Sequence, residues 1–250
     1  MDEKQTRQES VQHKGVNDQD NGDVGEKIRR DFYCKVSEVF SPESFFVQVQ
    51  GKEQDLDNLL TEINDFYNDV QLLDQLRLPS YQCQVDSLVA TIWEDDGFWY
   101  RAKIISIESP SKVQVLFIDF GTKALVFKEK LYFLHELFSI SERPALAFHA
   151  KLAGIGPVAR KWGIACSNRF QSLTGGGLIG TENTFLRGTI VEGNEKQNKV
   201  LLNLFTHTNG NEENVADVLV KEGFARFVVN ERAARVFLKI LRKFQVFSNS

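Results

Sequence analysis

The chain has 250 residues, 42% of them hydrophobic and 26% charged, which is enough apolar material for the core of one large or two small domains. Its formal net charge of −4 provides no general attraction for nucleic acid, so nucleic acid is not expected as a partner. No apolar run approaches the ~18 residues of a membrane span, and the spacing of Cys34, Cys83 and Cys166 indicates neither a disulfide framework nor a zinc site. We therefore expect a soluble, intracellular protein without a metal or cofactor.

The N-terminal segment, residues 1–30, is polar and contains no aromatic side chain. Burial cannot offset the ordering entropy of such a segment, so we predict a disordered tail. From Asp31 onward, two runs that alternate apolar and polar residues flank Ser41 and Pro42, which predicts a β-hairpin. Residues 52–73 then carry apolar side chains at helical spacing, so we predict one amphipathic helix that ends before Pro79.

Between residues 81 and 134 the apolar period changes to two, which is typical of strands. Four or five short strands separated by tight turns are predicted, at 86–93, 98–108, 112–120, 123–127 and 130–134. Short strands in this arrangement favour a small antiparallel barrel, because closure removes exposed sheet edges.

After Pro144 the predicted elements return to a mixture of strands and helices. They are a strand over 145–155, a helix over 158–173, strands over 184–193 and 199–207, and helices over 214–227 and 230–245. The last helix has a basic stripe, which is either a solvated face or a contact for RNA. Because mixed elements flank the barrel on both sides, the order indicates one domain inserted into another.

Three stretches of this chain resemble a known family. The runs "DDGFWYRAKI" (95–104) and "VQVLFIDFGT" (113–122) closely resemble the Tudor signature, and "LVKEGFARF" (219–227) resembles the staphylococcal-nuclease-like part of the extended Tudor domain. The resemblance implies a mainly β fold with helices (α+β), in which a small Tudor β-barrel at 81–140 is inserted into a split nuclease-like OB-type domain. The first part of that domain, with a linker helix, is expected at 31–80 and the second at 141–247.

The resemblance also implies an aromatic cage. In this family the cage binds an arginine, usually methylated, in the Arg/Gly-rich tail of a Piwi-type Argonaute or another protein of the Tudor pathway. A planar, weakly hydrated guanidinium stacks between ring faces, and methylation adds apolar surface while the charge remains. Matched by position, the cage rings in this chain are Tyr100, Phe117 and Phe120.

Two cage positions differ from the family pattern. A fourth ring is expected where this chain has Ile92, although Trp93 is adjacent and replaces that ring if the longer loop after it bulges the strand. At the position of the family's edge asparagine this chain has Thr122, whose hydroxyl side chain is shorter than a carboxamide. We therefore predict weak selectivity, with unmethylated arginine bound as well as methylated arginine or better.

Three functions are open at this point. The first is a non-catalytic scaffold for small-RNA silencing in cytoplasmic, perinuclear germline granules, with possible self-association; this pathway is implied by the resemblance alone. The second is a structural or dimerisation module with an idle cage. The third, a nuclease, lacks support because the strands at 184–193 and 199–207 show no matching set of acids. Arg101 and Asp119 could look like a catalytic acid and base, but an ion pair or a turn-bracing role is favoured.

Overall fold

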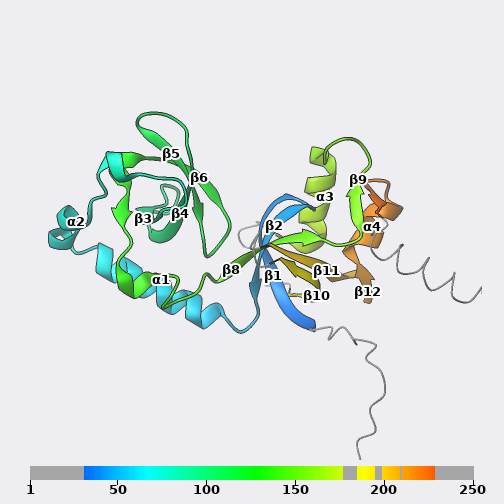
Figure 1. The fold of residues 1–250 in the computed structure, drawn as a ribbon. Coiled ribbons are helices and arrows are strands. Elements are labelled where there is room, and N and C mark those ends of the chain that lie inside the picture. Colours follow the sequence, from blue (N-terminus) through cyan, green and yellow to red (C-terminus); the bar gives the residue numbers. More distant parts are fainter. Residues whose placement is uncertain (1–30, 177–184, 195–198, 209, 229–250) are drawn as a thin grey trace, which may run out of the picture.

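The computed structural model describes residues 31–176, 185–194, 199–208 and 210–228. Strands predominate and helices are few, so the predicted α+β class is confirmed. Figure 1 shows two bodies side by side, a small barrel and a second sheet that is covered by helices. The predicted tail at 1–30 and the predicted basic helix at 230–245 lie outside the described residues. Among the helices that are described, none has the length and apolar character needed to cross a membrane.

The smaller body is a five-stranded antiparallel sheet that curls into a barrel, in the spatial order β6-β5-β4-β3-β7. Its strands are β3 (Leu88–Ile92), β4 (Trp99–Ile107), β5 (Lys112–Phe117), β6 (Lys123–Phe127) and β7 (Tyr132–Phe133). Along β5, Val113, Val115 and Phe117 are buried while the residues between them are half-exposed, which is the alternation of a strand with one face on a core. The predicted strands between 81 and 134 are confirmed.

The larger body is built on a six-stranded sheet in the order β10-β1-β2-β8-β11-β12. Its strands are β1 (Asp31–Ser41), β2 (Ser44–Val49), β8 (Ala147–Leu152), β10 (Leu186–Asn194), β11 (Lys199–Thr208) and β12 (Asn211–Asn214). Because β10 also pairs with β11, the first five of these strands in spatial order form a closed ring, as in an OB-type barrel. Strands β2 and β8 are direct neighbours in the ring, so the smaller barrel is inserted between two paired strands.

The helix predicted over 52–73 is two helices, α1 (Glu53–Tyr67) and α2 (Val70–Leu76), so the prediction of a single helix is wrong. The break occurs because Asp69 caps the second helix: its carboxylate accepts a hydrogen bond from the Gln71 amide at 3.0 Å. Just before the break, the side-chain oxygen of Asn68 accepts a hydrogen bond from the Trp99 indole at 3.2 Å. The end of α1 is thereby attached to β4 of the barrel.

The C-terminal part of the larger body also differs from the prediction. Helix α4 (Val215–Lys221) is shorter than the helix predicted over 214–227, because Gly223 has a φ of +79° and turns the chain into β13 (Ala225–Phe227). Strand β13 pairs with β9 (Ile155–Pro157). Helix α3 (Ile164–Thr174) begins later than the predicted residue 158, and β12 was not predicted.

Gly121 lies where the two bodies meet. Its φ is +91°, and a Cβ atom at this position would overlap the ring of Phe46 on β2. The Phe46 ring also stacks on His149 of β8, with ring centroids 4.8 Å apart and planes 9° apart. Burial, with the nearby Lys199 and Lys123, lowers the pKa of His149 to about 4, so the imidazole is neutral near pH 7.

We predict that Gly121→Ala destabilises the protein more than Gly97→Ala does. Both glycines have positive φ, but only at Gly121 does an added methyl group meet another side chain. The left-handed conformation should cost each alanine variant about 1–2 kcal/mol, and the overlap with Phe46 should add about 1–3 kcal/mol at Gly121. Urea unfolding of both variants measures the difference; equal losses would show that the Phe46 contact relaxes freely.

Candidate functional site

Four aromatic rings meet at one end of the small barrel, and we call them the ring cluster: Trp93, Tyr100, Phe117 and Phe120. The Tyr100 ring is central, with centroids 5.5 Å from Phe117, 5.5 Å from Phe120 and 6.0 Å from Trp93. Trp93 and Phe120 are each nearly perpendicular to Tyr100, at 72° and 84°. Phe117 is 1% exposed and Tyr100 8%, whereas Trp93 and Phe120 are partly exposed. The cluster therefore has a buried base and two accessible walls.

The strand register separates Ile92 from these rings. Ile92 pairs with Trp99 across β3 and β4, and Thr91 pairs with Tyr100. Paired residues face the same side of a sheet, so Ile92 and Tyr100 face opposite sides. Ile92 packs against the cluster of α1 and Trp99, on the side of the barrel away from the rings. Of the two residues considered for the fourth ring, the structure brings Trp93 to the ring cluster.

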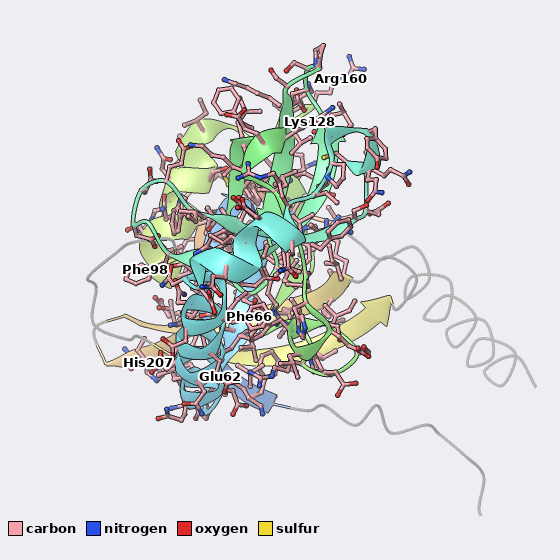
Figure 2. All side chains as sticks on the ribbon, turned by 90° about the vertical axis from the view of Figure 1, so that its left-hand side faces the viewer. Glu62, Phe66, Phe98, Lys128, Arg160 and His207 are labelled. Carbon is pink, nitrogen blue, oxygen red and sulfur yellow. The ribbon has the colours of Figure 1, made fainter. Side chains whose placement is uncertain are left out.

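The loop between β3 and β4 holds Trp93 in place. The Trp93 amide donates to the Phe98 carbonyl at 3.0 Å, and the Gly97 amide donates to the Trp93 carbonyl at 2.8 Å. Gly97 has a φ of +77°, which lets the chain turn within this short loop. Phe98, labelled in Figure 2, is 55% exposed at the edge of the barrel. An exposed ring thus adjoins the loop that carries Trp93.

An acidic side chain, Asp96, is bonded to the ring cluster. The Tyr100 hydroxyl donates to one Asp96 oxygen at 2.7 Å, and the Phe98 amide donates to the other at 2.9 Å. Burial, together with the bond to Asp96 and its charge, raises the pKa of Tyr100, so the hydroxyl remains protonated. Asp96 was not predicted as a site residue. The signal that could have indicated it is the run of three acids, 94–96, shortly before the aromatic strand.

Thr122 lies at the end of the loop that carries Phe120. Its carbonyl accepts a hydrogen bond from the Phe117 amide at 2.9 Å, and the Gly121 amide donates to the Phe117 carbonyl at 2.7 Å. The Thr122 side chain is partly exposed, and its hydroxyl makes no hydrogen bond to any residue that the structure describes. Thr122 is therefore close in sequence and structure to Phe120, with a short polar group at the position of the family's asparagine.

A buried ion pair stabilises the loop that carries Phe120. Arg101 on β4 binds both carboxylate oxygens of Asp119, with Nε 2.9 Å from Oδ2 and Nη2 2.6 Å from Oδ1. The predicted ion pair is confirmed. The guanidinium also donates to the carbonyls of Phe138, Arg143 and Pro144, so all five of its N–H groups are used. Arg101 is 1% exposed and Asp119 3%.

Two side chains of the larger body bind the same loop. The Ser37 hydroxyl of β1 donates to the Phe120 carbonyl at 2.6 Å, and the Gln48 amide of β2 donates to the Asp119 carbonyl at 2.6 Å. Ser37 lies at an irregularity in the pairing of β1 with β2, which frees it from the ladder. The loop that carries Phe120 is therefore held by both bodies.

The described residues contain no group of three or more His, Cys, Asp or Glu side chains that could hold a metal ion. His149 is bonded to the Ser44 hydroxyl at 2.8 Å and stacked on Phe46, which is a packing role. Arg187, on β10, is occupied by ion pairs with Glu212 at 2.7 Å and Asp31 at 3.3 Å. These groups do not form a catalytic arrangement with one another.

A family model described as Tudor domain matches residues 26–154. Human Tudor domain-containing protein 5 is 26% identical over 158 residues, which is 62% of this chain and 16% of that protein. The chain thus spans only a small part of that relative.

Two solved structures share the fold. The extended Tudor domain from BmPAPI in complex with sDMA aligns with a TM-score of 0.67 and 26% identity, over 78% of this chain and 98% of that one. A variant of the Drosophila melanogaster Papi extended Tudor domain, in complex with a Piwi N-terminal peptide that carries a dimethylated arginine, aligns with a TM-score of 0.67 and 22% identity, over 80% and 100%. Matches of this extent include much more than the small barrel.

We predict that Arg101→Met costs about 3–5 kcal/mol of unfolding free energy, because it leaves the Asp119 carboxylate buried without its partner. The control is Arg169→Met, which removes an ion pair with Glu222 whose side chains are 35% and 33% exposed; this change should cost about 1 kcal/mol or less. Urea unfolding at neutral pH measures both losses. Similar losses for the two variants would contradict the role assigned to the buried pair.

Proposed function

Because the chain belongs to the Tudor domain family, we propose that it is a non-catalytic extended Tudor scaffold whose ring cluster binds an arginine side chain, methylated or unmethylated, of a partner protein. The observation that carries this proposal is the packing of Trp93, Phe117 and Phe120 around Tyr100, whose hydroxyl is bonded to a carboxylate. Rings and a carboxylate in this arrangement suit the binding of a cationic side chain.

The rings suit a guanidinium for two physical reasons. Each ring face is electron-rich and attracts a cation, with about 2 kcal/mol or more for a contact shielded from water. The guanidinium is planar and weakly hydrated, so it loses little hydration on entering a slot between rings. The partly exposed rings of Trp93 and Phe120, each nearly perpendicular to Tyr100, supply such faces.

Asp96 adds the charge that the rings lack. Each of its oxygens already accepts one hydrogen bond, from Tyr100 and from the Phe98 amide, but a carboxylate oxygen has room for a second. An arginine N–H reaching this oxygen makes a charge-assisted hydrogen bond, which is about twice as strong as a neutral one. Asp96 thus partly replaces the asparagine that is absent at Thr122. It attracts unmethylated and methylated arginine alike, because both carry the positive charge.

The partner that fits this site is the Arg/Gly-rich tail of a Piwi-type Argonaute or of another protein in the same pathway. Support comes from the two similar domains described above, one bound to sDMA and the other to a Piwi N-terminal peptide. By this proposal the chain gathers components of small-RNA silencing in cytoplasmic, perinuclear germline granules. Nucleic acid has no part in it.

One observation favours an alternative, a structural or dimerisation module with an idle cage. The Tyr100 hydroxyl is already bonded to Asp96, and Tyr100 and Phe117 are almost fully covered by their neighbours. Rings that are bonded and covered by their neighbours in this way also occur in an ordinary hydrophobic core. The two functions differ in whether the partner is lost when the ring faces are removed.

We predict that the double change Tyr100→Ala with Phe120→Ala lowers the affinity for an arginine-containing peptide at least tenfold, since it removes two ring faces. The control is Tyr81→Ala, which removes a ring that is 81% exposed and lies outside the ring cluster. Fluorescence anisotropy with labelled Arg/Gly peptides, unmethylated and symmetrically dimethylated, measures the affinities. Circular dichroism establishes that both variants are folded. Binding that survives the double change would identify the cage as idle.

We further predict that wild-type protein binds the two peptides with affinities within about tenfold of each other, and that Thr122→Asn shifts the ratio toward dimethylarginine by about three- to tenfold. The longer carboxamide restores one hydrogen bond at the edge, worth roughly 1 kcal/mol. Ile92 is left unchanged because it packs on the α1 side. Thr61→Asn, on the exposed surface of α1, is the matched control. A ratio that Thr122→Asn does not move would contradict the assignment of Thr122 to the cage edge.

A further inference from the structure

A hollow lies on the larger body between β1 and α3, and we call it the β1–α3 groove. Its volume is about 310 Å³. Apolar side chains form its walls and amide side chains lie along α3; the main lining residues are Val39, Phe40, Trp162, Ile164, Asn168 and Gln171. The groove is thus wide enough for one side chain and offers both apolar and hydrogen-bonding surface.

The walls of the groove are held in place. The Trp162 indole donates to the Glu43 carboxylate at 3.1 Å, and the Ser167 hydroxyl donates to the Phe40 carbonyl at 3.2 Å. Ile164, the first residue of α3, is nevertheless 81% exposed. Neither Asn168 nor Gln171 makes a side-chain hydrogen bond to any part of the chain that the structure describes. The groove therefore presents fixed apolar walls and two amides available to a ligand.

The groove lies near the loop that carries Phe120, and Lys123 contacts Phe40 between them. Lys123 directly follows Thr122, and its Nζ lies 4.4 Å from the centroid of the Phe40 ring. Phe40 also meets Phe46 edge to face, with centroids 6.5 Å apart, and Phe46 lies against Gly121. These contacts place the Phe40 wall of the groove beside the segment that follows the loop of Phe120.

The distance between the loop of Phe120 and the groove can be estimated along β1. Its Ser37 is bonded to the Phe120 carbonyl at 2.6 Å, and Phe40 comes three residues later in the strand. At about 3.3 Å per residue, the groove begins about 10 Å from the loop of Phe120. An extended peptide with its arginine in the ring cluster covers that distance with three residues.

We propose that the β1–α3 groove binds an apolar side chain, such as leucine, of the same partner tail, three to five residues from the arginine in the ring cluster. The proposal rests on the proposed function of that cluster. The walls of Phe40, Trp162 and Ile164 cover the apolar side chain, while Asn168 and Gln171 hydrogen-bond the peptide backbone. The groove thereby gives the domain a preference for sequence around the arginine, which a cage alone does not provide.

The test uses the full chain and a set of labelled peptides, each with one central arginine in a Gly/Ser background and one leucine at a different offset. We expect leucine at a single offset of three to five residues, on one side of the arginine, to raise the affinity about five- to tenfold by anisotropy. Ile164→Glu should abolish this gain and leave the affinity for the leucine-free peptide unchanged. The control Val158→Glu, at an apolar residue that is 61% exposed and does not line the groove, should keep the gain.

The outcomes separate the two proposals. If every leucine offset binds like the leucine-free peptide, or if the gain survives Ile164→Glu, the groove proposal is overturned and the proposed function stands. If wild-type protein binds none of the arginine peptides, the proposed function is overturned and the groove proposal with it. A gain that is lost in Ile164→Glu and kept in Val158→Glu supports both.

Discussion

The buried ion pair between Arg101 and Asp119 is the contact on which the arrangement of the candidate site depends. Taking two charges out of water is costly, and the cost is offset here by a bidentate pair with a full complement of hydrogen bonds. The remaining donors of Arg101 bind carbonyls of the segment 138–144, which leads from the barrel to β8. One guanidinium thus fastens a barrel strand, the loop of Phe120 and the connection to the larger body.

This arrangement makes the loop of Phe120 a joint property of both bodies. Asp119 faces inward to Arg101, its carbonyl is bound by Gln48, and the Phe120 carbonyl is bound by Ser37. Gly121 then allows the close approach of Phe46 that no other residue type permits. The position of the Phe120 ring relative to Tyr100 therefore depends on side chains from β1 and β2. A barrel separated from the larger body lacks the hydrogen bonds from Ser37 and Gln48 that help to position the Phe120 ring.

Much of this fold could be predicted because the local periodicity of apolar residues indicates its elements. The alternation in the hairpin and in the five barrel strands specified their type and order, and Arg101 with Asp119 was predicted as a pair. Two of the errors lie where a single residue decides where an element begins or ends. Asp69 starts a new helix by capping it, and Gly223 ends α4 and allows β13 to form. A periodic pattern of apolar residues gives little indication of such single-residue signals.

The site was predictable in its residue types and less so in its geometry. The resemblance to the Tudor signature implied Tyr100, Phe117 and Phe120. The choice between Ile92 and Trp93 depends on register, since a shift of one residue exchanges the two faces of a strand. Asp96 belongs to the site only because its loop turns back on Tyr100. Ser37 and Gln48 come from another body, and no spacing in the sequence indicates contacts across 83 and 71 residues.

The insertion of the barrel between β2 and β8 also has a consequence for synthesis. The barrel strands follow one another within residues 88–133, whereas Asp31 of β1 pairs with Thr189 of β10 and Phe45 of β2 with Ala150 of β8. Local contacts form quickly and distant ones slowly, so the topology favours a barrel that closes while the hairpin before it still has unpaired edges. Open strand edges are sites of aggregation. A substitution that delays closure of the barrel prolongs this exposure, and its first effect is a lower yield of folded chain, before any change in what the folded chain binds.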